Sequence, residues 1–310
     1  MLQNIHIQNF RCFEDFQADG FERVNLIGGK NNSGKTCLLE GIFFGNAVEQ
    51  PKFVIVELRD QRNAVQDFEF YKNVSYQKRI ELPIIIKTVK DGEIHNVKTT
   101  YPFDNSEINF PPEKWEAGRV NYHRTSFVLN KNSNLSNYKI IELFNNLNEE
   151  KKDKICLLLQ NILSIKINKI TAEDDLIQIS TPINKLPIHY FGDALQNIFN
   201  YLVSFYSSMG GWRNKILLID EIENGIHYSA HYDFWKNIFK LSKELNVQIF
   251  ATTHSLEMIN AFNEVAKEEG EGAYFEMSKE FETGKIFAFK HDTELLTYEL
   301  LKPESTLRGE

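Results

Sequence analysis

Eight consecutive residues near the N-terminus have the types and spacing needed to hold a phosphate group. The run is Gly29-Lys30-Asn31-Asn32-Ser33-Gly34-Lys35-Thr36. Glycines let successive backbone N–H groups turn inward around phosphate oxygens, where larger side chains would collide. A helix expected from Thr36 would direct its positive N-terminal end at the anion. The pattern predicts a nucleotide site in which Lys35 brings positive charge to the phosphates and the Thr36 hydroxyl is a ligand of magnesium. We include Cys37, the next residue, in the predicted nucleotide-binding set.

Two adjacent carboxylates follow a second apolar run, at Asp220 and Glu221. Neighbouring acids at a buried edge repel each other unless a cation or a proton lies between them. Mg²⁺ held by Asp220 would satisfy this requirement, and Glu221 could then take the proton from an attacking water. Considered alone, an Asp-Glu pair at this place is also compatible with a helix cap or a loop.

A histidine, His254, follows a third apolar run. From there its ring can donate a hydrogen bond to a γ-phosphate, so we predict a catalytic role for His254 beside Glu221 and Lys35. The alternative is a structural histidine, with Ser255 as the cap of the next helix.

The three apolar runs are typical of buried parallel strands, and open α/β sheets bind ligands at the carboxyl ends of such strands. They are residues 24–27, 216–219 and 247–250. Helical periodicity alternates with them at residues 36–44, 193–205, 229–245 and 256–265. Two final strands within 272–290 and a helix at 293–301 are expected after them. The sequence therefore predicts an α/β fold with a mostly parallel core sheet flanked by helices.

The middle of the chain has a different pattern. From about residue 53 to 103 the residues alternate as in antiparallel strands, with a turn at 90–93, and residues 138–163 hold two helical patterns. We predict a core formed by residues 1–45 and 186–310, divided by an insertion at 46–185 with antiparallel strands followed by helices.

Composition limits the partners and the location. The chain is 42% hydrophobic and 25% charged, without a run of the roughly 20 apolar residues needed to cross a bilayer. Its three cysteines are too scattered for a disulfide framework or a zinc site. We expect a cytoplasmic protein with no membrane partner. The net charge of -8 argues against a surface that grips nucleic acid everywhere, although one basic groove would still allow a nucleic acid partner.

Four segments in order resemble the P-loop ATPase heads of the ABC and SMC type. They are the phosphate loop, Leu217–Glu221, Glu223–His227 and Thr253–Ser255. The nearest resemblance is to bacterial AAA-family ATP-binding proteins related to the OLD and RecF groups, whose opening is similar to Ile7–Phe13. It implies an ABC-ATPase-like P-loop NTPase fold and an ATPase that uses ATP and Mg²⁺.

The resemblance also implies a head-to-tail dimer or higher homo-oligomer, with each ATP between one phosphate loop and the partner's signature segment. Gly192 and Asp193 match that segment but lack its usual serine, so slow hydrolysis is expected. Asn224 and Gly225 match a loop near the dimer interface. Arg11 matches a position that can approach the nucleotide, a surface arginine being the alternative.

The biological role is implied by family analogy alone. OLD proteins carry a C-terminal Toprim nuclease, which we do not expect here because about 45 residues follow Val265. Free-standing ATPases of this kind accompany effectors in phage-defence or toxin–antitoxin pairs. The leading hypothesis is an ATP-dependent switch or sensor that controls a separately encoded effector protein in anti-phage defence. The alternatives are a RecF/SMC-like DNA-binding ATPase in repair or maintenance, and an ATP-bound scaffold with little turnover.

Overall fold

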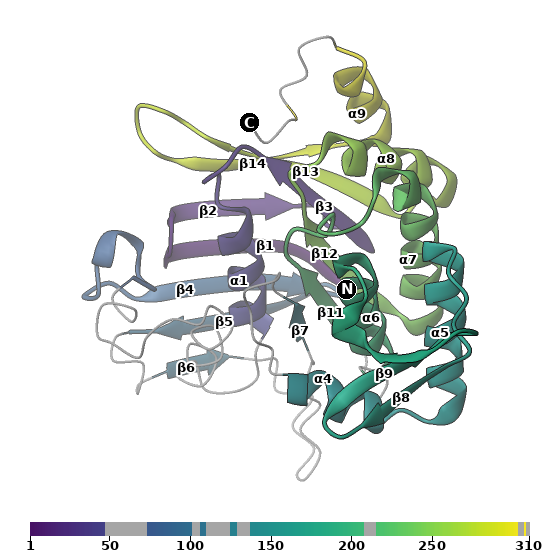
Figure 1. The fold of residues 1–310 in the computed structure, drawn as a ribbon. Helices are drawn as coiled ribbons and strands as arrows, with labels where there is room; N and C mark the ends of the chain where they lie inside the picture. The colour runs from purple at the N-terminus through teal and green to yellow at the C-terminus, as the bar shows by residue number, and fades with distance from the viewer. Residues whose placement is uncertain are drawn as a thin grey trace.

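A six-stranded sheet forms the centre of the protein (Figure 1). The computed structural model describes residues 1–46, 73–100, 106–109, 125–128, 137–207, 215–302 and 307. The strands lie in the order β14-β13-β3-β12-β11-β7. Their bounds are β3 (Val24–Gly29), β7 (Thr125–Val128), β11 (Lys215–Ile219), β12 (Val247–Thr252), β13 (Gly272–Lys279) and β14 (Ile286–His291). Every pairing from β13 to β7 is parallel and only the β13–β14 pairing in this sheet is antiparallel, which confirms the mostly parallel core sheet.

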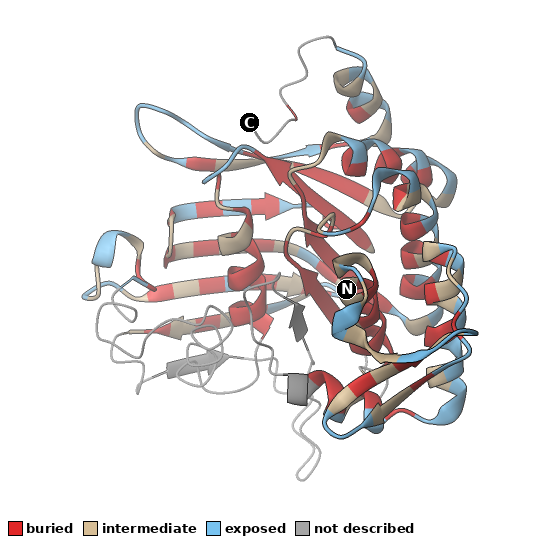
Figure 2. Ribbon diagram, viewed as in Figure 1, coloured by how far each residue is buried: buried red, intermediate tan, exposed pale blue. Residues whose placement is uncertain are grey.

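The central strands β3 and β12 are buried along their whole length, which explains why they are largely continuous apolar runs rather than alternating ones (Figure 2). Leu26 and Ile249 enter the core on one face, and Ile27 and Phe250 enter the core on the other. The strands predicted at residues 24–27, 216–219 and 247–250 are confirmed, and they are neighbours in the sheet.

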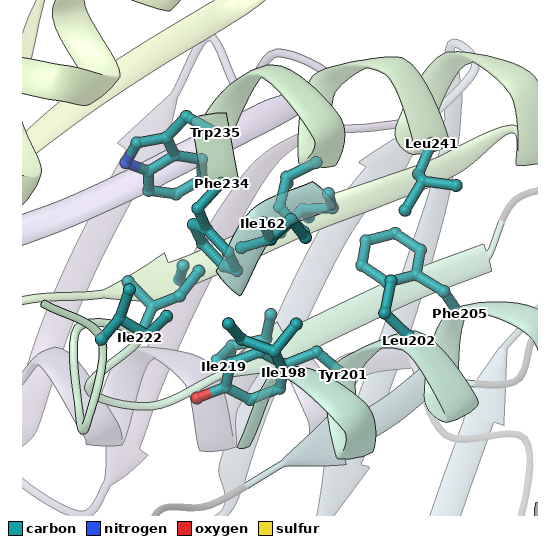
Figure 3. Close-up of a cluster of buried hydrophobic side chains, with 14 of the residues drawn as sticks. Ile162, Ile198, Tyr201, Leu202, Phe205, Ile219, Ile222, Phe234, Trp235 and Leu241 are labelled. Carbon is teal, nitrogen blue, oxygen red and sulfur yellow. The ribbon is translucent and has the colours of Figure 1, made fainter. Parts of the chain in front are cut away.

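Helices cover one face of the sheet. They are α4 (Asn137–Asn145), α5 (Glu149–Leu163), α6 (Asp193–Ser207), α7 (His231–Leu245), α8 (Leu256–Glu269) and α9 (Thr293–Leu300). Figure 3 shows side chains of α5, α6 and α7 meeting Ile219 at the end of β11 and Ile222 just beyond it. The end of β11, where the predicted carboxylates lie, is thus packed firmly beneath α6.

The other face packs against α1 (Lys35–Asn46), which lies between the central sheet and a second, antiparallel sheet (Figure 1). That five-stranded sheet has the order β2-β1-β4-β5-β6. Its strands are β1 (Leu2–Phe10), β2 (Phe13–Asp19), β4 (Ile84–Lys90), β5 (Glu93–Thr99) and β6 (Ser106–Asn109). Close approach of the helix requires small residues: a Cβ on Gly41 would lie 2.5 Å from Ile7, and one on Gly45 2.6 Å from Ile86.

A small antiparallel sheet and three short 3₁₀ turns complete the described structure. The sheet has the order β10-β9-β8, with β8 (Lys169–Glu173), β9 (Leu176–Ser180) and β10 (Lys185–Pro187). The turns are η1 (Tyr76–Lys78), η3 (Ile188–Tyr190) and η4 (Tyr228–Ala230). Among the described residues, no helix is long and apolar enough to cross a membrane.

Hydrogen-bonded sheets cross both predicted domain boundaries. Strand β4, from the range 46–185, pairs with β1, and β7, from the same range, pairs with β11 in the central sheet. The division of the chain into core and insertion remains a prediction. Residues 53–72 and 101–103 of the alternating segment lie outside the described residues.

Candidate nucleotide site

The predicted phosphate loop joins the end of β3 to the start of α1, between a buried strand and a helix. Gly29 has φ +127°, and a Cβ there would lie 2.2 Å from the Met277 carbonyl oxygen of β13. Gly34 has φ +94°. Both positions require glycine, because other residues rarely adopt these angles and Gly29 has no room for a side chain. The N-terminal end of α1 therefore opens onto a loop with the backbone shape of an anion site.

Lys35 is folded over this loop. Its Nζ donates to the carbonyl oxygens of Gly29 at 2.7 Å and Lys30 at 2.9 Å, and only 5% of the residue is exposed. Burial lowers the Lys35 pKa to about 8, against the opposing effect of nearby carboxylates, first among them Asp220. The buried Ser33 hydroxyl has no hydrogen-bond partner within the described part of the chain. A cation and an unsatisfied hydroxyl at one loop suit a phosphate ligand.

The carboxylate of Asp220 connects three elements. The Thr36 hydroxyl of α1 donates to Asp220 Oδ2 at 3.0 Å, and the Thr252 hydroxyl of β12 donates to Oδ1. The structure therefore brings together Thr36 and Asp220, the two predicted metal ligands. Two hard oxygen donors fit Mg²⁺, which takes one or two protein carboxylates and completes its coordination shell with waters and phosphate oxygens. Within the described residues there is no cluster of three or more His, Cys, Asp or Glu that could hold a metal by itself.

Glu221 lies directly beyond Asp220 in a left-handed backbone conformation, with φ +50°. Its N–H donates to Thr252 Oγ1 at 2.8 Å, which ties the turn to β12. Asn224 Nδ2 donates to Glu221 Oε2 at 2.8 Å. A left-handed backbone conformation costs energy at a glutamate and persists only where the surroundings hold the residue in place. These two hydrogen bonds help to hold Glu221.

His254 lies on the neighbouring turn, after β12. Its backbone N–H donates to Glu223 Oε1 at 2.7 Å. Burial lowers the pKa of the His254 ring and the charge of Lys35 lowers it further, so the imidazole is held neutral. The buried ring atom His254 Nδ1 lacks a hydrogen-bond partner among the residues that the structure describes. The alternative role of Ser255 is confirmed, because its hydroxyl caps α8 by accepting from Met258 N at 3.1 Å.

Glu223 is a site residue that sequence reasoning left without a role. Its Oε2 is buried and has no hydrogen-bond partner in the described structure, while Oε1 holds the backbone of His254. The available signal was its position two residues after Glu221, in a segment rich in acids. The partner at His254, 31 residues away, could not be inferred from that spacing.

The structure places Arg11 beside α1 and Cys37 within the first turn of that helix. Arg11 Nε makes an ion pair with Glu40 Oε2 at 2.9 Å, and Glu40 is fully buried on α1. Cys37 lies next to Cys12: hydrogen bonding with this thiol and burial raise the Cys12 pKa. Cys12 Sγ lies 3.1 Å from the position of a Cβ on Gly34. Arg11 thus packs against the helix that follows the phosphate loop, and Cys37 is part of that helix.

The predicted signature segment, at Gly192 and Asp193, lies beside the predicted interface loop, at Asn224 and Gly225. Gly225, with φ +76°, packs against the start of α6, where an added Cβ would lie 2.7 Å from Asp193 Cβ. Asn197 Nδ2, one turn into α6, donates to the Asn224 carbonyl oxygen at 2.8 Å. Among the described residues, no atom beyond the two chain neighbours lies within 4 Å of the Cβ position of Gly192. Gly192 therefore presents open space at the N-terminal end of α6.

Several known proteins are similar to this chain. The model of the AAA ATPase domain family matches residues 1–156 and 121–259. An ATP/GTP phosphatase of Helicobacter pylori is 24% identical, over 87% of this chain and 89% of that protein. The DNA replication and repair protein RecF of Clostridium acetobutylicum is 37% identical over 14% of this chain and 12% of its own length.

The fold is similar to that of a solved Smc head domain with an extended coiled coil, bound to the C-terminal domain of ScpA derived from Pyrococcus furiosus. The TM-score is 0.60 at 10% identity, over 96% of this chain and 98% of that one. At such low identity the likeness shows the fold alone. It confirms the predicted ABC-ATPase-like α/β architecture.

Proposed function

The chain belongs to the AAA ATPase domain family, and from that premise we propose that it binds Mg–ATP and hydrolyses it at Lys35, Thr36, Asp220 and Glu221. The observation that carries this proposal is the Thr36–Asp220 hydrogen bond of 3.0 Å. It joins the phosphate loop to the carboxylate turn, the turn after β11 that carries Asp220 and Glu221, as a shared magnesium site requires. The ATP/GTP phosphatase relative, which this chain matches over most of both lengths, supports the same activity.

Each residue has a separate task in the proposed reaction. Backbone N–H groups of the loop hold the phosphate oxygens, and Lys35 moves from the Gly29 and Lys30 carbonyls to the β- and γ-phosphates. Mg²⁺ held by Thr36 and Asp220 would neutralise charge on the phosphate oxygens. Glu221 accepts a proton from the water that attacks the γ-phosphorus, and ADP leaves.

His254 would donate a ring N–H to a γ-phosphate oxygen. A neutral imidazole has one donor and one acceptor nitrogen, and the lowered pKa of the His254 ring in the nucleotide-free protein favours that form. The test of the whole proposal is phosphate release from ATP by the purified chain. We expect turnover that requires Mg²⁺ and that Lys35→Ala and Glu221→Gln remove; turnover unaffected by chelation or by both variants contradicts the proposal.

We propose further that two chains pair head to tail, so that the segment at Gly192 meets the partner's nucleotide. The open space around Gly192 supports this arrangement, because a phosphate group can approach the N-terminal end of α6 there. Light scattering of Glu221→Gln with and without ATP tests it. A doubling of mass with ATP is expected, and an unchanged monomer contradicts the pairing.

For the biological role we propose a cytoplasmic ATP-dependent switch that controls a separate effector protein in anti-phage defence. The similarity to a solved Smc head bound to a ScpA domain supports a protein partner in general terms. Affinity capture from the native host tests the switch. The bait is Glu221→Gln, which ATP should hold as a closed pair (the locked variant), and Lys35→Ala is the matched control. A protein enriched only with the locked variant is expected; identical captures contradict it.

A RecF/SMC-like role on DNA is the second candidate, favoured by the short RecF match and the SMC-head fold. Turnover stimulated by duplex DNA, with stimulation lost steeply as salt increases, would favour it over the switch. A scaffold with little turnover is the third, and measured phosphate release separates it from the other two.

A further inference from the structure

We propose that Asn224 is a positioning residue that sets the orientation of the Glu221 carboxylate, and that Asn197 on α6 holds Asn224 in place for this task. The inference rests on the proposed function, in which Glu221 accepts the proton of the attacking water. Asn224 acts through Glu221 and has no contact with the reacting atoms in this proposal.

Two hydrogen bonds join Asn224 to Glu221. The side-chain amide donates from Nδ2 to Glu221 Oε2 at 2.8 Å, and the backbone N–H donates to the Glu221 carbonyl oxygen at 3.1 Å. An ionised carboxylate only accepts hydrogen bonds, so a donor fixed on one oxygen determines the direction of the other. Asn224 thereby fixes the orientation of the Glu221 carboxylate toward a water.

Asn224 is itself fixed from the opposite side. Its carbonyl oxygen accepts from Asn197 Nδ2 at 2.8 Å, and the next residue, Gly225, packs directly against Asp193 and Ala194 at the start of α6. The loop after Glu221 is therefore attached to α6 by a hydrogen bond and by close backbone packing.

Glu221 lies between two anchors. On the β12 side, Thr252 accepts from the Glu221 N–H at 2.8 Å and its carbonyl oxygen accepts from Ile222 N at 3.0 Å. On the α6 side, Asn224 and Asn197 form the second anchor. Tyr201, one turn beyond Asn197, shares this face of α6: burial raises its pKa, as do the charges of Glu223, Asp220 and Glu221. The first turns of α6 thus lie against the carboxylate turn.

Because of these contacts, the position of α6 helps to determine the orientation of Glu221, the proposed general base. The helix begins at Asp193, directly after Gly192, where the proposed partner nucleotide would lie. A shift of the helix on binding would move Asn197 and Asn224, and the Glu221 carboxylate with them. Orientation of a reacting group matters strongly, because a misplacement of about 1 Å can cost roughly 100-fold in rate.

The experiment compares Asn224→Ala, Asn224→Asp and Asn197→Ala in the full chain. Asn237→Ala is the control, because Asn237 is a partly exposed residue of α7 whose Nδ2 donates to the Asp233 carbonyl oxygen of its own helix. Steady-state kcat and KM for Mg–ATP are measured with the thermal midpoint of each variant. We expect kcat to fall about 10- to 100-fold in both Asn224 variants and several-fold in Asn197→Ala. KM should stay within about twofold, because none of these side chains holds the nucleotide.

Asn224→Asp separates positioning from packing. The substitution keeps the size and shape of the side chain but replaces the donor with an acceptor that repels Glu221. A merely structural role predicts near-normal kcat for Asn224→Asp, and positioning predicts a kcat at least as low as that of Asn224→Ala. Normal kcat in Asn224→Asp while Glu221→Gln is inactive overturns this inference alone. Normal turnover in Glu221→Gln overturns the proposed function itself, whatever Asn224 does.

Discussion

The Thr36 hydroxyl donates to Asp220 Oδ2 at 3.0 Å although 184 residues separate the two along the chain. Thr36 lies in the first turn of α1, and Asp220 follows the last residue of β11. The Thr252 hydroxyl holds the other carboxylate oxygen, so the Asp220 side chain cannot rotate away without losing two hydrogen bonds. A cation placed here would find two oxygen ligands already in position.

Asp220→Asn should weaken Mg–ATP binding by roughly 10- to 100-fold, because a neutral amide is a poor ligand for a hard cation. Binding of ATP in the presence of EDTA should change far less. The measurement is ATP affinity with and without Mg²⁺ for the wild type and the variant. Equal Mg²⁺ dependence in both proteins would place the metal elsewhere.

Lys35→Ala should remove ATP binding while the fold survives. The substitution costs two hydrogen bonds from Nζ to loop carbonyls, but these carbonyls lie at a ligand site that water can reach once the side chain is gone. Lys30→Ala is the matched control, because Lys30 is an exposed lysine on the same loop and its proposed contribution to the site is made by the backbone, which the substitution retains. ATP affinity and circular dichroism are measured for both variants. Near-normal ATP affinity in Lys35→Ala, or equal losses in the two, contradicts the assignment.

The sequence predicted the elements that place these residues because their signals are local. Continuous apolar runs identified β3, β11 and β12, and the loop pattern identified the start of α1. The partners of the middle strands could not be predicted in this way. Strand β4 pairs with β1 across more than 70 residues, and β7 joins the central sheet beside β11. Alternation shows that a segment is a strand, but strand pairing depends on the tertiary fold.

The candidate site likewise has features that the sequence predicts and features that it does not. The chemistry of Lys35, Thr36, Asp220 and Glu221 follows from residue type and order along the chain. The contacts that orient these side chains do not, because Asn224 is held by Asn197 on α6 and Glu223 holds the backbone of His254. A hydrogen-bond partner on another element becomes visible only when the elements are packed together.

Gly192 and Gly225 should respond differently to alanine. Gly225 has φ +76° and no room for a Cβ, so Gly225→Ala should lower the free energy of unfolding by about 1–3 kcal/mol. Gly192 has open space, and Gly192→Ala should leave stability within about 0.5 kcal/mol of the wild type. If Gly192 faces the partner's phosphates, its added methyl should still reduce ATP-dependent pairing. Urea unfolding and light scattering with ATP measure these effects; normal pairing by Gly192→Ala would remove this residue from the interface.

His254 should titrate below the ordinary histidine pKa of about 6.5 in the nucleotide-free protein, because burial and the Lys35 charge oppose its protonation. The unfolded chain takes up this proton near pH 6.5 while the folded chain does not, so the group lowers stability as the pH falls below that value. Histidine NMR measures the titration, and His254→Gln assigns the resonance among the eight histidines. A His254 pKa at or above the ordinary value contradicts the neutral ring.

Glu221→Gln tests the mechanism rather than binding. The substitution retains the size of the side chain, and its amide oxygen can still accept from Asn224, but it cannot take a proton. Lys35, Thr36 and Asp220 remain to hold Mg–ATP, so affinity should stay near that of the wild type while kcat falls by roughly two orders of magnitude or more. Uncleaved ATP should also hold a head-to-tail pair closed, which light scattering would detect as a larger mass. Asp220→Asn is the comparison, because it should weaken binding first. Unchanged turnover in Glu221→Gln would make His254 the next candidate for the base, and loss of binding in that variant would instead identify Glu221 as a ligand of the metal.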